Sequence, residues 1–359
     1  MTILIKKPLN IRIHRLLWAL GMCTCLVLSN FTYAQTQELE NELEVIQEEQ
    51  RIDLDSGRPK KSSPESFDYR ATPGVYGTVT SIGSDTLASL ISLWAEQFQG
   101  LYPHVKFQIQ APGSATAPQA LIQGSASIGP MSRALTLTEI QRFTRQYGYP
   151  PTSLIVAVDA MAIYIEKNNP LEHLNLQQVD AIFSMTRFCG GPRSIKTWQQ
   201  LGVNKFGTDL NIQVFGRNSA SGTYDLFKNL ALCDGDYYTS VNEMPSSSSV
   251  VQSVASSIGG IGYAALGHGN TEVKALALGK RGELFYAPNA QNITDGKYPF
   301  TRYLYIVVNK PPNAPLPTLE KTFLSFVLSE QGQNIVKQSN YYPVSGTLLK
   351  QQRQLLTGK

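Results

Sequence analysis

The sequence predicts an α/β fold, and three observations lead to this prediction. Two strand-like segments, 77–80 and 105–109, each run into a short turn of small and hydroxyl residues and then into a helix-like segment. The apolar run at 160–165 has the composition of a strand that is buried on both faces. Beyond residue 70 the apolar and charged content is ordinary, and about 290 residues suffice for two sizeable cores.

The N-terminal segment has the layout of a secretory signal. Four basic residues precede an apolar stretch from Leu16 to Leu28, and the segment ends on Thr32-Tyr33-Ala34. We therefore expect residues 1–34 to be a signal peptide, cleaved after Ala34. A retained membrane anchor and a lipoprotein attached through Cys23 or Cys25 are the alternatives. The apolar stretch is short for a spanning helix, so we favour cleavage and a soluble product.

The excess positive charge lies in this signal. The chain has 31 Lys and Arg against 27 Asp and Glu, and without the four basic signal residues the two numbers are equal. A protein that binds nucleic acid or anionic membranes through general electrostatics keeps a basic surplus. We therefore expect no nucleic-acid partner.

Residues 35–70 have the composition of a flexible linker. They are acidic and glutamine-rich at first, and then basic with Ser and Pro around 59–64. With few apolar residues the segment cannot bury a core of its own. Its length leaves open a docking role toward a membrane partner or the cell envelope.

Two junctions follow the first two strands. The first, Ser81–Thr86, precedes a helix-like segment at 87–98 in which five apolar residues recur at helical spacing. The second, Ala111–Thr116, precedes a helix-like segment at 117–124. The carboxyl ends of strands in an open α/β sheet face a ligand crevice, so we expect the hydroxyls of both junctions to meet there.

The cysteine content agrees with export. Cys23 and Cys25 leave with the signal, so Cys189 and Cys233 remain. A remaining pair in an exported chain is expected to form a disulfide in an oxidising compartment. Two unrelated buried thiols are the alternative.

The segment Arg217–Asp225 has the chemistry of an anion clamp at the start of a helix. The first turn of a helix carries unpartnered backbone N–H groups and the positive end of the helix dipole. Ser221 and Thr223 add hydroxyl donors, and Gly222 allows close approach of the backbone. Arg217 can supply a two-pronged charge-assisted contact. An ordinary turn or helix N-cap is the alternative.

Taken together, these segments resemble the phosphate-binding proteins of bacterial ABC transporters. The three junctions, with Gly124–Arg133, Gly259–Tyr263 and Tyr298–Tyr305, occur in the right order over roughly residues 75–345. The resemblance implies the type II periplasmic binding protein fold, in which two α/β lobes joined by crossing strands close on a dehydrated phosphate.

Within that fold we expect residues 71–163 and 264–359 to form lobe 1 and residues 164–263 to form lobe 2. The hinge crossings are expected at Ala160–Ile165 and near Gly262–Tyr263.

The resemblance also implies the ligand-binding residues, which are Thr86, Leu87 through its backbone N–H, Ser114, Arg217, Ser221, Gly222 and Thr223. Ser132 stands where many members have an aspartate that accepts the proton of hydrogen phosphate. A carboxylate repels fully deprotonated sulfate, and a serine discriminates less, so a broader oxyanion (sulfate) binder is an alternative.

Asp85 is expected to cap the following helix or, turned inward, to replace the missing acceptor. Asp225 is expected to orient Arg217 or to complement the helix dipole.

The resemblance implies that the chain is an exported, periplasmic solute-binding protein, not an enzyme. It would capture inorganic phosphate for an ABC permease in the inner membrane, as a monomer without a cofactor or metal. Secretion or surface association is the alternative location.

The alternative functions are an exported phosphatase with His268 as its base and a secreted or surface interaction protein. His104, His173 and His268 show no metal-site or nucleophile-elbow spacing, which favours reversible binding.

Overall fold

The computed structural model describes residues 69–358, apart from 206–209, 281 and 283. They belong to one compact unit, Ser62–Lys359. The predicted signal segment 1–34 and residues 35–68 of the predicted linker lie outside the described residues. Within the part of the chain that is described, no helix is long and apolar enough to cross a membrane.

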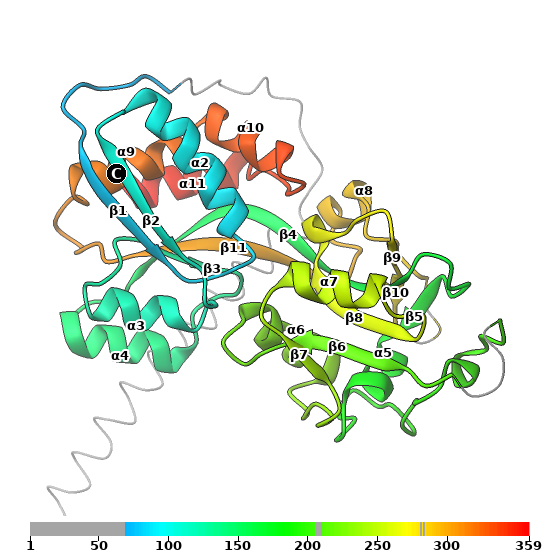
Figure 1. The fold of residues 1–359 in the computed structure, drawn as a ribbon. Helices are drawn as coiled ribbons and strands as arrows, with labels where there is room; N and C mark the ends of the chain where they lie inside the picture. The colour runs from blue at the N-terminus through cyan, green and yellow to red at the C-terminus, as the bar shows by residue number, and fades with distance from the viewer. Residues whose placement is uncertain (1–68, 206–209, 281, 283, 359) are drawn as a thin grey trace, which may run out of the picture. The chain divides into compact units, whose positions relative to one another are not determined.

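Two groups of hydrophobic clusters divide this unit into what we call the first lobe and the second lobe. Buried residues up to Ala157 and from Leu304 onward form the clusters of the first lobe. Buried residues from Ala160 to Phe300 form the clusters of the second lobe. The predicted α/β fold with two lobes is therefore present, and the lobes are linked where the chain passes between the two groups (Figure 1).

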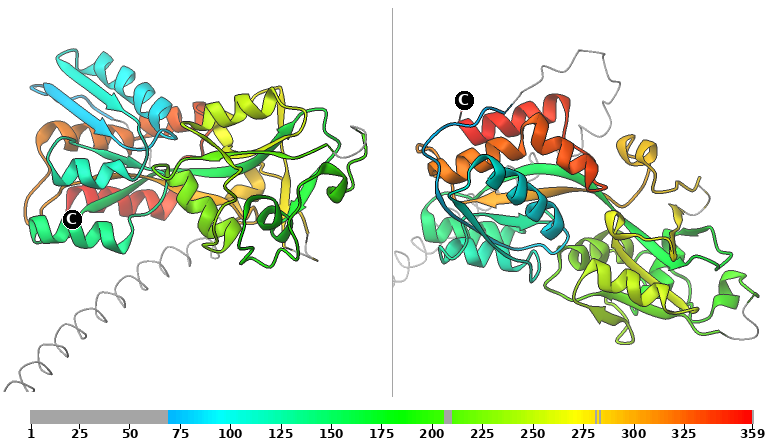
Figure 2. Two further views of the ribbon diagram at one scale, coloured as in Figure 1. Left: turned by 60° about the horizontal axis from the view of Figure 1, so that its bottom comes forward. Right: turned by 45° about the horizontal axis from the view of Figure 1, so that its top comes forward.

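The elements of the first lobe are β1 (Gly77–Ile82), α2 (Ala88–Leu101), β2 (Val105–Gln110), α3 (Thr116–Ile122), β3 (Gly129–Met131), α4 (Leu137–Tyr147), β11 (Thr301–Val308), α9 (Thr318–Val327), α10 (Glu330–Gln338) and α11 (Gly346–Thr357). The strands β1 and β2 pair in parallel, as the two predicted strand–turn–helix junctions require. The C-terminal helices share a core with the N-terminal elements: Phe98 of α2 meets Phe323 of α9 with ring centroids 5.3 Å apart. Figure 2 shows these orange and red helices beside the cyan elements.

The elements of the second lobe are β5 (His173–Asn175), α5 (Leu176–Phe183), the 3-10 helix η1 (Trp198–Leu201), β6 (Gln213–Arg217), α6 (Gly222–Leu232), β7 (Asn242–Met244), α7 (Ser247–Ala255), β8 (Gly260–Ala265), the 3-10 helix η2 (Leu266–His268), β9 (Val273–Ala275), β10 (Ala277–Gly279) and α8 (Ala290–Thr294). The strand β6 pairs in parallel with both β7 and β8, and α6 and α7 both begin at turns rich in serine.

One long strand, β4 (Thr152–Glu166), passes from the first lobe into the second. Residues 152–160 of this strand pair antiparallel with β11, and residues 161–165 pair antiparallel with β8. The seven-stranded sheet has the order β3-β11-β4-β8-β6-β7, with β9 also paired to β4, so β4 lies at its middle. Its apolar second half is buried on both faces, which explains the continuous apolar run in the sequence.

The return to the first lobe differs from the prediction. The expected crossing near Gly262–Tyr263 lies in β8, which is fully buried between β4 and β6 within the second lobe. Residues after β8 stay in the second lobe, because β10 pairs with β5 and Phe300 packs in its core. The chain re-enters the first lobe at β11, so residues 264–300 pack with the second lobe.

The predicted disulfide is present. Cys189, in the loop after α5, is bonded to Cys233 at the C-terminal end of α6, and their Cα atoms are 5.2 Å apart. The bridge closes a loop within the second lobe, across a sequence separation of 44 residues.

Candidate functional site

The predicted ligand-binding residues are buried together where loops of the two lobes meet. From the first lobe come the β1–α2 loop, the β2–α3 loop and the residue after β3. From the second lobe come the last residue of β6, the β6–α6 loop and the first two residues of α6. No more than 1% of the surface is exposed in any of Thr86, Leu87, Ser114, Ser132, Arg217, Ser221 and Thr223, and Gly222 is also buried.

Direct contacts cross between the lobes at this point. Thr86 Oγ1 lies 3.3 Å from Thr223 Oγ1. The backbone N–H of Ala115 donates to the carbonyl of Ala220 at 3.1 Å. The lobes are therefore in van der Waals and hydrogen-bonding contact around the predicted site.

Gly222 makes this approach feasible. A Cβ atom at this position would lie 2.5 Å from Ser114 Oγ and 2.7 Å from Ser132 Oγ, closer than real Cβ contacts allow. The hydroxyls of Ser114 and Ser132 are themselves 3.2 Å apart, and the backbone N–H of Ser132 donates to Ser114 Oγ at 3.0 Å. The structure thus places Ser132 beside Ser114 and opposite the start of α6.

Two of the predicted residues stand at helix starts. Leu87 precedes the first residue of α2, and Gly222 is the first residue of α6. Backbone N–H groups at these positions have no acceptor within their own helix. Ser221 caps α6 through a hydrogen bond from Thr223 N to its Oγ at 3.1 Å. Both helices consequently direct N–H donors and positive dipole ends at the cluster of hydroxyls.

Arg217, at the end of β6, is held by a dense set of hydrogen bonds. Its Nη2 donates to Asp85 Oδ1 at 2.8 Å and to the Pro245 carbonyl at 3.0 Å. Its Nη1 donates to Ser247 Oγ at 3.2 Å, and its Nε donates to the Met244 carbonyl at 3.3 Å. A guanidinium has five N–H groups, so among the described residues one N–H on Nη1 remains for a ligand. The predicted two-pronged ligand contact does not fit this arrangement.

Asp85 does not cap the following helix. The N-cap position of α2 is Leu87, and no side chain caps this helix. The carboxylate instead accepts from Arg217 through Oδ1 and from the backbone N–H of Ser247 through Oδ2, the latter at 3.3 Å. The N-cap expectation was wrong because Arg217, a long-range partner, was not foreseeable from local sequence.

Asp225 does not orient Arg217. Its Oδ2 accepts from Arg133 Nε at 2.6 Å, and Arg133 also forms two hydrogen bonds with Glu139 of α4. Asp225 does lie in the first turn of α6, where a carboxylate complements the helix dipole. Burial, the largest single influence, raises the pKa of Glu139, but the Arg133 guanidinium and the hydrogen bonds with Thr136 together bring that pKa below its ordinary value.

Arg302 and Asp159 border the site and were not among the predicted residues. Arg302 Nη1 donates to Thr223 Oγ1 at 3.0 Å and to the Ser132 carbonyl at 3.3 Å. Its Nε and Nη2 donate to Asp159 Oδ2 at 2.9 and 2.7 Å. The side chains are 3% and 1% exposed, respectively. The sequence signal was a charged residue inside each of two largely apolar strands, Asp159 in β4 and Arg302 in β11.

The three histidines of the described chain lie in different places. His104 immediately precedes β2, and His173 in β5 stacks on Phe285 with ring centroids 4.1 Å apart. His268 Nδ1 lies 2.9 Å from Ser248 Oγ in the first turn of α7. Burial lowers the pKa of His268, although the nearby Asp159 carboxylate acts in the opposite direction. In the described residues no group of three or more His, Cys, Asp or Glu could hold a metal ion.

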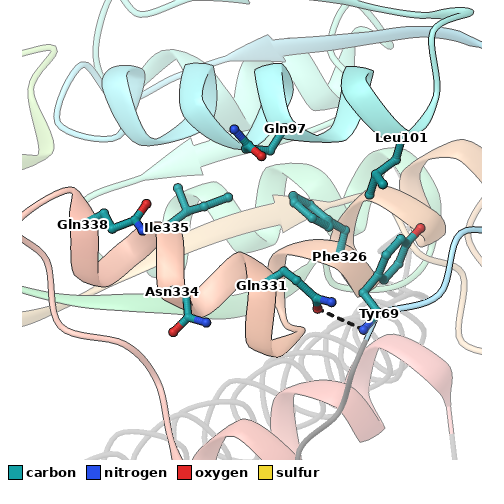
Figure 3. Close-up of a pocket in the computed structure, with 8 residues that line it drawn as sticks. All are labelled: Tyr69, Gln97, Leu101, Phe326, Gln331, Asn334, Ile335 and Gln338. Carbon is teal, nitrogen blue, oxygen red and sulfur yellow. Dashed lines mark hydrogen bonds between the residues drawn. The ribbon is translucent and has the colours of Figure 1, made fainter.

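A pocket of about 470 Å³ lies elsewhere in the first lobe, among α2, α9 and α10 (Figure 3). Tyr69, Phe326 and Gln331 contribute to its lining, and the Tyr69 backbone N–H donates to Gln331 Oε1 at 2.9 Å. None of the predicted ligand-binding residues lines it.

Comparison with known proteins agrees with this architecture. A family model described as a PBP superfamily domain matches residues 69–331. The chain belongs to the PBP superfamily. The match includes both lobes up to the start of α10.

Within the PBP superfamily, the chain is 51% identical over 282 residues to the phosphate-binding protein PstS of Pseudomonas aeruginosa, covering 78% of this chain and 87% of that protein. It is 24% identical over 261 residues to PstS of Staphylococcus aureus, covering 72% and 76% of the two chains. The first of these likenesses is high enough to place the chain in the same family as PstS.

Solved PBP structures share the fold. A putative phosphate ABC transporter substrate-binding protein from Clostridium perfringens, with bound phosphate, matches with a TM-score of 0.62 and 26% identity, covering 75% of this chain and all of that chain. An ABC-type phosphate transport receptor from Vibrio cholerae matches with a TM-score of 0.58 and 25% identity, covering 74% of this chain and all of that chain. These likenesses confirm the predicted two-lobed binding-protein fold.

Proposed function

We propose that this protein captures inorganic phosphate between its two lobes and delivers it to an ABC permease. The main observation that supports this proposal is that the predicted hydroxyl, N–H and guanidinium donors are buried together at one point between the lobes. The relative with 51% identity is a phosphate-binding protein, and a structural neighbour contains bound phosphate. Both support phosphate as the ligand.

The proposed ligand contacts follow from the chemistry of the buried groups. The hydroxyls of five residues can donate to phosphate oxygens, and these residues are Thr86, Ser114, Ser132, Ser221 and Thr223. The backbone N–H groups at Leu87 and Gly222 add donors at positive helix ends. Arg217 contributes its remaining Nη1 N–H. The negative charge of a dehydrated anion held by these donors is balanced mainly by helix and N–H dipoles, because Asp85 already neutralises the charge of Arg217.

The proposed motion is a closure of the lobes about the two chain crossings. We assign residues 69–157 and 301–358 to one moving body and residues 160–300 to the other, following the two groups of hydrophobic clusters. The crossings are β4 near residues 158–161 and the chain between Phe300 and Thr301. Met161 N donates to the Phe300 carbonyl at 2.9 Å, which ties the crossings together. Phosphate would bind the closed arrangement best and so shift the population toward it.

Selectivity is proposed to depend on Ser132. A serine hydroxyl can accept the proton of hydrogen phosphate or donate to a fully deprotonated oxyanion. It therefore favours phosphate over sulfate less strongly than a carboxylate would. A broader oxyanion binder stays the second candidate, favoured by Ser132 and by the neutral charge balance of Arg217 with Asp85.

The proposal includes binding without catalysis. The PstS relatives are named for binding, and the Clostridium perfringens neighbour is a substrate-binding protein. The base that a phosphatase would use, His268, bonds with Ser248 of α7. We also propose that the protein acts as a monomer and needs neither a cofactor nor a metal.

The proposed location is the periplasm. Its support is the signal-like composition of residues 1–34, with cleavage after Ala34, and the Cys189–Cys233 disulfide, which forms in oxidising compartments. The expected linker 35–70 includes Tyr69, which instead packs on Phe326 of the first lobe. The permease partner is proposed to be in the inner membrane.

Isothermal titration calorimetry tests the function. The mature protein, stripped of phosphate by unfolding and refolding, is titrated with phosphate and then with sulfate. We expect one-to-one binding of phosphate and weaker binding of sulfate. Equal affinities would make it a general oxyanion binder, and the absence of binding to either would refute the proposed function.

A further inference from the structure

Asp85 connects the two lobes through both of its carboxylate oxygens. It belongs to the β1–α2 loop of the first lobe, and both of its donors belong to the second lobe. Oδ1 accepts from Arg217 Nη2 at 2.8 Å, and Oδ2 accepts from the backbone N–H of Ser247 at 3.3 Å. The ion pair is secluded from water, with side chains that are 10% exposed for Asp85 and 1% exposed for Arg217.

The donors to Asp85 form an anion-binding arrangement on the second lobe. Ser247 is the first residue of α7, a nine-residue helix whose N-terminus carries partial positive charge and N–H groups that have no acceptor within the helix. Arg217 adds a full positive charge beside it. The carboxylate of the first lobe occupies this arrangement as an intramolecular anion.

The other acceptors of Arg217 lie in its own lobe. The carbonyls of Met244 and Pro245 and the hydroxyl of Ser247 all belong to the β7–α7 segment of the second lobe. These bonds persist in any rigid movement of the lobes. Among the described acceptors of Arg217, Asp85 alone is contributed by the first lobe, so this is the Arg217 bond that separation of the lobes breaks.

The second ion pair between the lobes, Arg133–Asp225, costs less free energy to break than Asp85–Arg217. Asp225 of α6 is 36% exposed, and its partner Arg133 keeps two hydrogen bonds to Glu139 within the first lobe. Separation of the lobes therefore leaves Arg133 paired and returns Asp225 to water. Breaking a secluded pair such as Asp85–Arg217 costs more than breaking an exposed one.

We propose that Asp85 is a positioning residue that, through its bonds with Arg217 and Ser247, latches the lobes in the closed arrangement. The proposal rests on the proposed function, because the latch acts on the release of bound phosphate. Phosphate leaves only after the bonds from Arg217 and Ser247 to Asp85 break. The latch therefore governs the dissociation rate more than the association rate.

The first test is Asp85→Asn, which keeps the size and removes the charge. The asparagine amide has only one acceptor oxygen, so its NH2 group has to face either Arg217 Nη2 or the Ser247 N–H, and both of these are donors. Stopped-flow measurements on the mature protein should show phosphate dissociating about tenfold faster or more. The association rate should stay equal or rise, since a carboxylate near the entering anion is removed. Asp236→Asn, at the exposed Lys228–Asp236 pair, is the matched control and should behave as wild type.

The second test separates the latch from folding defects in the variant. Proline is favoured at the first position of a helix and has no N–H, so Ser247→Pro deletes the donor to Asp85 Oδ2 while α7 can still form. Ser247→Ala removes the hydroxyl alone and serves as its control. Dissociation should be faster in Ser247→Pro than in Ser247→Ala.

A third measurement does not depend on phosphate. Hydrogen exchange of the Ser247 amide in the phosphate-free protein should be faster in Asp85→Asn than in wild type. If phosphate dissociates from Asp85→Asn at the wild-type rate, the latch is refuted and the proposed function stands. If wild type binds no phosphate, the proposed function fails, and an unchanged Ser247 exchange rate in Asp85→Asn then refutes the latch as well.

Discussion

At the scale of single residues, the site depends on how closely polar atoms of different loops approach each other. Thr223 Oγ1 illustrates this, since it meets Thr86 Oγ1 at 3.3 Å and accepts from Arg302 Nη1 at 3.0 Å. Gly222 next to it has no room for a side chain against Ser114 and Ser132. A single methyl group therefore suffices to hold the lobes apart.

The residue-scale prediction concerns Gly222→Ala. The added methyl group collides with Ser114 and Ser132 of the other lobe, so the variant should lose about 1–3 kcal/mol of phosphate-binding free energy. Its free energy of unfolding should change little, because separated lobes relieve the collision. Titration calorimetry and urea unfolding measure the two quantities. The control is Gly100→Ala on the exposed face of α2, where a methyl group meets nothing within 4 Å. Wild-type affinity in Gly222→Ala would contradict contact between the lobes in the bound state.

At the scale of elements, the neighbouring strands β4 and β11 contribute one buried ion pair to a largely apolar part of the sheet. Asp159 of β4 and Arg302 of β11 are opposite each other in the antiparallel register. They lie next to the crossing between lobes, and Arg302 reaches Ser132 and Thr223 from there. The pair therefore links the two strands that carry the chain between the lobes to the predicted ligand-binding residues.

The element-scale prediction concerns Arg302→Met. This change leaves the Asp159 carboxylate buried without its cation, and it should lower the free energy of unfolding by about 3–5 kcal/mol. Adding Asp159→Asn should recover part of the loss, because the uncompensated charge is gone. Urea unfolding of both single variants and the double variant measures the coupling. Lys167→Met at the exposed Lys167–Glu272 pair is the control and should leave stability unchanged. Additive effects of the two changes would show that the pair does not act as a unit.

At the scale of the whole molecule, two hydrophobic cores are stabilised by different means. The first lobe combines N-terminal and C-terminal elements, with Trp94, Phe98 and Phe323 in its core. The second lobe is built from one continuous stretch of chain and carries the disulfide. A disulfide stabilises chiefly the part of the chain whose unfolded state it restricts.

The whole-molecule prediction concerns reduction of Cys189–Cys233. Reduction should lower the free energy of unfolding of the second lobe by about 2–4 kcal/mol. Hydrogen exchange should accelerate in α5 and α6 and stay unchanged in α2 and α9. The double variant Cys189→Ser/Cys233→Ser serves as the control, because a reductant should have no further effect on it. Equal acceleration in both lobes would mean that they unfold as one unit.

Local sequence determined the elements around the site. The predicted strands at 77–80 and 105–109 and the helix-like segments at 87–98 and 117–124 correspond to β1, β2, α2 and α3. Periodicity and turn chemistry predict these elements because they depend on hydrogen bonds between residues a few positions apart. The cysteine content likewise predicted the disulfide, since only two cysteines follow the signal.

Tertiary structure decided which charged groups meet and where the chain changes lobe. Asp85 pairs with Arg217 across 132 positions, and Asp159 pairs with Arg302 across 143. The return to the first lobe came at β11, because β8 to α8 pack on the second core and not on the first. Pairing and packing over such separations depend on the complete fold, and no local pattern of residue types encodes them. The sequence by itself determined the elements and the donors they carry, while the tertiary structure decided how those donors are shared between the lobes.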